Sequence, residues 1–143
     1  MLGDPCPWSA IPISEVIGNT TSDSSFERAD SWIRNGTSNH SACSPSLEST
    51  LPTRVIDVGE GISDVRLYES SEGEVARYLC LSHCWGNSQP LTTTSENLER
   101  HKRSIPWMTL PRAFQDAIIV ARELRVKYAW IDSLYILQDD KPD

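Results

Sequence analysis

The hydrophobic residues are unevenly distributed, and their pattern divides the chain near residue 53. Residues 1–53 contain 16 Ser and Thr residues and few large apolar side chains. Such a segment can bury little surface to offset the entropy cost of ordering it. We therefore expect residues 1–50 to form a flexible Ser/Thr-rich leader with one short helix at about 26–33. The structured domain is expected at residues 51–143.

Apolar alternation begins at residue 55 and predicts a β-hairpin. Residues 55–58 and 65–68 are rich in alternating β-branched and apolar residues, with Gly59 and Gly61 between them. Period-two alternation is typical of strands that bury one face, and glycines favour a turn. The two segments should therefore pair as a hairpin with a long turn.

Two continuous apolar runs with a helix between them predict a βαβ unit. Residues 77–82 and 128–132 are typical of strands buried on both faces of a parallel sheet. Residues 110–126 between them carry an apolar stripe at helical spacing, and a capping box at 93–96 predicts a short helix over 97–103. The stripe consists of Leu110, Phe114, Ala117, Ile118, Ala121 and Leu124. The two strands should run parallel with a right-handed connection, which gives an α/β fold.

Charge and composition exclude several classes of protein. The 143 residues carry a net charge of −7, so the excess of Lys and Arg that binding to nucleic acid needs is missing. The longest apolar run, residues 117–121, is too short for a membrane segment. Residues 1–10 contain acid and proline but no basic residue, so no secretory signal is expected. We expect one cytoplasmic domain whose four cysteines are reduced thiols.

The best candidate for a site lies where the two parallel strands end. Ligands bind outside the carboxyl ends of the strands in open parallel sheets. The candidate residues that follow the first strand are Ser82, His83, Trp85 and Gly86, with Cys84 among them. The second strand is followed by Asp132 and Ser133. A hydroxyl, an imidazole, a thiol and a carboxylate should thus meet at one edge of the sheet.

Three interpretations of this edge remain open. In the first, Ser82 or Cys84 is a nucleophile activated by His83, with Asp132 orienting the imidazole; adjacent strand residues point to opposite faces, which opposes it. In the second, Ser82 and Asp132 are hydrogen-bonding groups of a polar ligand pocket walled by Trp85. In the third, Ser82 and Asp132 cap loops and helix starts, and the tryptophan is core.

Metal and nucleotide motifs are weak in this sequence. His40 and Cys43 form one group of potential ligands, and Cys80, His83 and Cys84 form another. A structural zinc site uses four ligands in recognisable pairs, and the spacing of four between the two cysteines is not a Cys-x-x-Cys knuckle. No metal site is expected. The glycine-rich and Walker fingerprints of nucleotide-binding proteins are also absent from the sequence.

The chain resembles the fungal heterokaryon incompatibility (HET) domain family in a series of ordered blocks. The blocks are Leu51-Pro52-Thr53-Arg54-Val55-Ile56-Asp57-Val58-Gly59, Tyr78-Leu79-Cys80-Leu81-Ser82-His83-Cys84-Trp85-Gly86, Pro90-Leu91-Thr92-Thr93-Thr94, Asn97-Leu98, Ile105-Pro106-Trp107, Leu110-Pro111, Asp116-Ala117-Ile118, Tyr128-Ala129-Trp130-Ile131-Asp132-Ser133-Leu134 and Gln138-Asp139-Asp140. Together they span residues 51–143. Trp32, His40 and Cys43 look like the segment that precedes them in the family.

The resemblance implies an effector, or an incomplete effector, of fungal non-self recognition and programmed cell death. Its partners would be other HET or sensor-domain proteins, or further copies of the chain. The family is thought to be distantly related to TIR domains, which implies a flavodoxin/TIR-like parallel sheet. Two alternatives follow: a TIR-like hydrolase with NAD as substrate rather than cofactor, and a non-catalytic decoy or regulatory fragment that pairs with complete HET domains.

The sequence departs from the family pattern at three places. Gly36 stands where the upstream segment usually has Cys, and Tyr135 replaces the Cys usual after the Asp-Ser-Leu triplet. The chain stops after the Gln-Asp-Asp block, whereas the family continues with a helix carrying Trp and Glu and with further strands. The resemblance therefore implies a domain truncated on its C-terminal side, without the segment in which a TIR-like catalytic Glu would lie.

Overall fold

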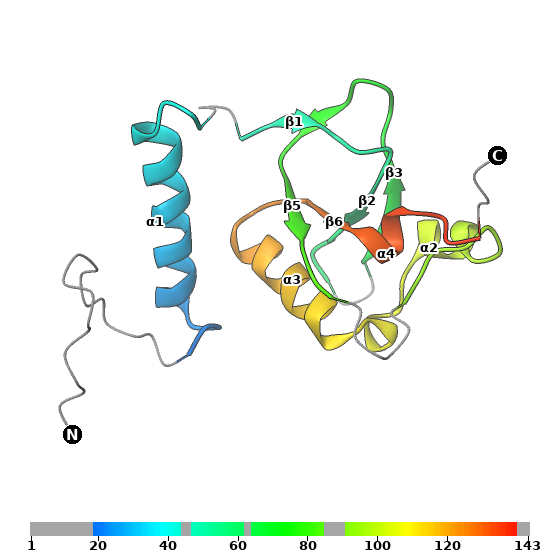
Figure 1. Ribbon diagram of the computed structural model, residues 1–143. Helices are drawn as coiled ribbons and strands as arrows, with labels where there is room; N and C mark the ends of the chain where they lie inside the picture. Colours follow the sequence, from blue (N-terminus) through cyan, green and yellow to red (C-terminus); the bar gives the residue numbers. More distant parts are fainter. Residues whose placement is uncertain (1–18, 44–46, 62–63, 85–90, 140–143) are drawn as a thin grey trace.

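The computed structural model describes residues 19–43, 47–61, 64–84 and 91–139 (Figure 1). Its elements in chain order are α1 (Asp23–Asn39), β1 (Ser49–Thr50), β2 (Arg54–Asp57), β3 (Arg66–Glu69), β4 (Val75–Ala76), β5 (Tyr78–Leu81), α2 (Leu98–Arg103), the 3-10 turn η1 (Trp107–Thr109), α3 (Arg112–Glu123), β6 (Tyr128–Ile131) and α4 (Asp132–Tyr135). In the described ranges, no helix has the length and apolar character needed to cross a bilayer.

A four-stranded mixed sheet in the order β3-β2-β6-β5 forms the centre of the fold. β2 and β3 form the predicted antiparallel hairpin, and β5 runs parallel to β6 with Leu81 beside Ile131, as the βαβ pattern predicts. β2 joins β6 in antiparallel orientation, so among the pairs within this four-stranded sheet β5–β6 is the parallel one. The α/β class is therefore confirmed, and the flavodoxin/TIR-like topology stays a prediction.

α3 covers one face of the sheet with the predicted apolar stripe. The side chains buried on this helix are Phe114, Ala117, Ile118 and Ala121. Phe114, Ile118 and Ala121 join one core cluster with Ile56 of β2 and Ile131 of β6. α3 is shorter than the predicted 110–126: Pro111 precedes its first residue, and Arg125 takes a left-handed φ of 54° just after its last turn. Helices commonly end at a residue in this left-handed conformation, most often a glycine.

The opposite face of the sheet carries a smaller aromatic cluster. Tyr68 and Tyr128 stack with ring centroids 5.3 Å apart, and Leu51 and Val55 are buried beside them. The two-stranded ribbon of β1 and β4 supplies part of the cover on this side, since Ala76 packs against the same cluster. Both faces of the sheet therefore bury apolar side chains. β6 fits the prediction of a strand buried on both faces, whereas the same prediction for residues 77–82 is wrong, because β5 is an edge strand whose residues are half-buried or exposed.

Two local predictions differ from the structure. The predicted helix at 26–33 is part of the longer α1, none of whose residues is buried. The predicted capping box at 93–96 is wrong, because Thr93 is fully buried and its hydroxyl lies 3.3 Å from Nδ1 of the buried His101. The start of α2 is held instead by Asn97, whose Oδ1 accepts a hydrogen bond from the Thr94 N–H at 2.9 Å.

Candidate functional site

The parallel pairing of β5 and β6 brings their carboxyl ends to the same edge of the sheet. Ser82 follows β5 directly and is exposed, and His83 beside it is largely buried. Asp132 follows β6 as the first residue of α4, and Ser133 is fully buried. These four predicted site residues therefore emerge at neighbouring strand ends. Trp85 and Gly86, which complete the prediction, lie outside the described residues.

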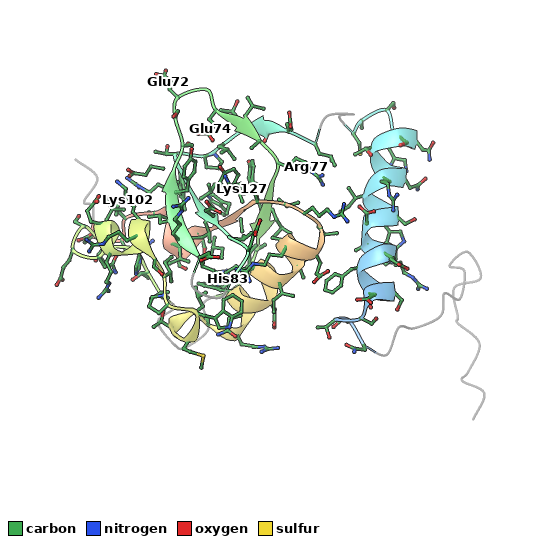
Figure 2. All side chains as sticks on the ribbon, turned by 180° about the vertical axis from the view of Figure 1, so that it is seen from behind. Glu72, Glu74, Arg77, His83, Lys102 and Lys127 are labelled. Carbon is green, nitrogen blue, oxygen red and sulfur yellow. The ribbon has the colours of Figure 1, made fainter. Side chains whose placement is uncertain are left out.

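His83, which is labelled in Figure 2, lies beside the Asp132 carboxylate without a full hydrogen bond to it. Its Nδ1 is 3.7 Å from Asp132 Oδ1, beyond the usual range for an N–H···O bond. The ring packs edge-on against Phe114 with centroids 5.0 Å apart, which fixes its orientation from the α3 side. Both ring nitrogens are buried, and neither has a hydrogen-bond partner among the described residues.

Asp132 and Ser133 organise the first turn of α4. Asp132 Oδ1 accepts the Ser133 backbone N–H at 2.7 Å, while the Ser133 carbonyl accepts the Thr93 N–H at 3.1 Å. Asp132 is the first residue of α4 rather than its N-cap, which is Ile131. The Ser133 hydroxyl oxygen is buried and has no hydrogen-bond partner in the described part of the chain. A buried polar atom without a hydrogen-bond partner lowers the stability of the folded state, so this hydroxyl calls for an explanation.

The nucleophile interpretation stays a prediction, because only the His83–Asp132 approach of the proposed triad is present in the described residues. His83 and Asp132 are close enough for the carboxylate to orient the imidazole after a small movement. Ser82 and Cys84 are exposed, and within the described ranges neither forms a hydrogen bond with a ring nitrogen of His83. Cys43, Cys80 and Cys84 are free and exposed thiols, and the described residues contain no cluster of three or more metal-ligating side chains.

Sequence reasoning missed a cavity at the other end of the strands. It has a volume of about 480 Å³ and is lined by Asp57, Val58, Gly59, Glu60, Arg122, Arg125, Val126 and Lys127. Arg122 shapes its wall by donating hydrogen bonds to the carbonyls of Val58, Gly59 and Gly61. Arg122 lies outside the apolar stripe of α3, and no local signal in the sequence indicates that its guanidinium reaches the loop after β2.

By fold, the chain is an α/β protein with polar side chains at the carboxyl ends of its two parallel strands. Residues 78–143 match the model of the family described as heterokaryon incompatibility protein (HET). The resemblance to that family is therefore confirmed for this part of the chain, which runs from β5 through α4 and contains every candidate site residue. No curated protein and no solved structure matches the chain.

Proposed function

We propose that this chain is a HET-type effector in fungal non-self recognition and programmed cell death. The observation that carries the proposal is the family match over residues 78–143, since that segment includes both strand ends and both residues of the His83–Asp132 pair. Effector action then depends on the edge of the sheet where Ser82, His83 and Asp132 meet. The remainder of the fold serves to hold this edge in place.

A growth assay in a filamentous fungus tests the proposal. The chain is expressed from an inducible promoter, and we expect growth arrest and loss of viability after induction. His83→Ala and Asp132→Ala should each reduce the arrest, because they remove the buried imidazole and its neighbouring carboxylate. Asp116→Ala is the matched control, since it removes a half-exposed carboxylate that pairs with Arg112 along α3. Protein level is followed by immunoblot in every strain.

Two results would overturn the proposal. One is normal growth of cells in which the unaltered chain accumulates in folded form. The other is an arrest that is equally strong with His83→Ala, Asp132→Ala and Asp116→Ala, because cell death would then not depend on the strand-end residues.

A second candidate function is hydrolysis of NAD at the same edge. The specific observation in its favour is the 3.7 Å approach of an imidazole to a carboxylate where parallel sheets commonly bind nucleotides. Water would add to the ribose carbon as the bond to nicotinamide breaks, which yields ADP-ribose and nicotinamide. Incubation of the purified chain with NAD should then release nicotinamide, and Asp132→Ala should abolish the release. No release from the unaltered chain eliminates this function without affecting the first.

A further inference from the structure

The two outer strands of the central sheet differ in how their free sides are protected against pairing with another chain. β3 forms one edge and is held against α2, where Lys102 Nζ lies 2.8 Å from Glu69 Oε2 (Figure 2). β5 forms the other edge, and within the described ranges its backbone forms hydrogen bonds only with β6. The strand Tyr78–Leu81 contains no charged residue. Natural proteins usually protect edge strands with charges, proline or a cover, because an open edge can pair with another chain.

The side chains of β5 leave its outer edge accessible. Leu79 and Leu81 pack against the core cluster on the side of α3, and Tyr78 packs against the aromatic cluster on the opposite side. Cys80 points to the same side as Tyr78 and is exposed. The strand is therefore anchored on both faces while its edge and one thiol remain available.

We propose that β5 is a self-association surface, and that β5 strands of two copies pair in antiparallel orientation across a two-fold axis at Cys80. A second copy fits this edge because the strand is self-complementary. In this register Cys80 lies opposite Cys80 of the second copy, and Leu79 lies opposite Leu81. Residues that lie opposite each other then point to the same face of the joined sheet. No like charges meet within the paired strands. The sheets of both copies join into one, with both α3 helices on the same side.

The size of this contact predicts a weak dimer. A pairing of four-residue strands falls below the area of standard protein interfaces. The assembly should therefore form and dissociate within the concentration range of an ordinary biophysical experiment. A dimer this weak can be shifted toward the monomer by a competing contact on the same strand.

α1 is positioned to compete with the second copy. Figures 1 and 2 show α1 beyond β5 and α3, on the side of the sheet opposite to α2, and Figure 2 shows Arg77 extending toward it. Acidic residues of α1, among them Glu27, line a cavity of about 450 Å³ together with Arg77 and Arg125 of the body. Glu123 also lines the body side, but the two arginines outnumber it there, so the acidic residues of α1 should be attracted toward the start of β5. Salt weakens such attraction between exposed groups and should favour the dimer.

Sedimentation of the purified full chain at about 0.05 M and about 0.5 M NaCl tests the inference. We expect a concentration-dependent dimer whose fraction is larger at the higher salt concentration. Cys80→Lys should abolish the dimer, because two lysines would lie directly opposite each other. Val75→Lys is the matched control: it replaces an apolar residue that is also exposed, on β4 away from the β5 edge, and should leave the dimer intact. A chain that is monomeric at both salt concentrations, or a dimer that survives Cys80→Lys, overturns the proposal.

Cross-linking tests the register independently of Cys80→Lys. A variant carrying Cys6→Ser, Cys43→Ser and Cys84→Ser retains only Cys80. Diamide, which takes up the two protons and two electrons lost by two thiols, should join it into a covalent dimer. A variant that retains only Cys84 should remain monomeric. Equal cross-linking of both variants contradicts the proposed register.

The role of α1 is tested by charge reversal. Glu27→Lys should raise the dimer fraction at low salt, whereas Glu96→Lys, the same change on an exposed residue before α2, should leave it unchanged. An equal response of the two variants refutes competition by α1. These measurements use purified protein, so they stand or fall separately from the growth assay.

Discussion

Arg122→Ala should destabilise the chain far more than its place on a polar helix face indicates. Arg122 extends from the last turns of α3 to the loop after β2. Its Nε donates to the Val58 and Gly59 carbonyls at 3.0 and 3.1 Å, and its second terminal nitrogen donates to Gly61 at 2.9 Å and also to Val58. The guanidinium lies 5.5 Å from the centre of the Trp107 ring. One side chain thus joins α3, η1 and the hairpin.

The expected loss follows from these contacts. A hydrogen bond with a charged donor contributes about 1.5–3 kcal/mol, and a cation–π contact adds about 0.5–1 kcal/mol. Several bonds here share one half-buried guanidinium, and water can reach the freed carbonyls. We therefore expect Arg122→Ala to lower the free energy of unfolding by about 2–3 kcal/mol in total. Arg112→Ala, on the same helix, removes a 76% exposed side chain paired with Asp116 and should cost only about 0.5 kcal/mol.

Urea unfolding followed by tryptophan fluorescence measures both values. With a slope of about 1.5 kcal/mol per molar urea, the midpoint should fall by about 1.5 M for Arg122→Ala and by about 0.3 M for Arg112→Ala. Arg122→Lys should lie close to the alanine variant, because an ammonium group cannot reproduce the fork of donors. Equal losses for Arg122→Ala and Arg112→Ala would refute the assignment of Arg122 as a structural clamp.

Three further predictions concern buried or constrained positions. Burial, followed by the charge of Arg100, lowers the pKa of His101. The contribution of the neutral His101 to stability is therefore complete above about pH 6.5 and is lost as the pH falls through the folded-state pKa. Urea midpoints should fall on acidification, and His101→Gln should remove that part of the pH dependence. Gly59 has a φ of 56°, and an added Cβ would lie 2.4 Å from Asp64 Cβ. Gly59→Ala should therefore cost at least about 1 kcal/mol in urea unfolding, whereas Gly36→Ala, with open space in α1, should increase helical circular dichroism. Ser133→Ala should leave the free energy of unfolding unchanged or raise it by up to about 1 kcal/mol, and a loss above that value would indicate a partner for the hydroxyl.

The sequence was sufficient to predict the parallel pair of strands, the hairpin and the helix that covers them. The continuous apolar runs indicated the parallel strands, and the periodic stripe through Phe114 and Ile118 indicated the helix. The antiparallel contact of β2 with β6 was not predicted, because strand order depends on which edges are available once all strands exist. α1 was predicted too short, since a helix without buried residues leaves little periodicity to follow.

The candidate site was predictable to the level of strand ends. The rule for parallel strands placed Ser82 and Asp132 at one edge, and the register of Leu81 with Ile131 agrees with it. The edge-on contact of His83 with Phe114 could not be predicted, because it depends on the packing of α3 against the sheet. The reach of Arg122 to three carbonyls has the same origin. Side-chain contacts between elements distant in sequence leave no local pattern.

The position of β2 in the sheet sets a lower limit on the part of this chain that can fold. The segment that matches the HET family begins at residue 78, yet β6 obtains its second neighbour from β2, and the core cluster obtains Ile56 and Leu67 from the hairpin. A fragment cut at the start of the family match would expose one side of β6 and remove Ile56 and Leu67 from the core cluster that α3 also joins. Shortened versions of the protein should therefore begin before Arg54.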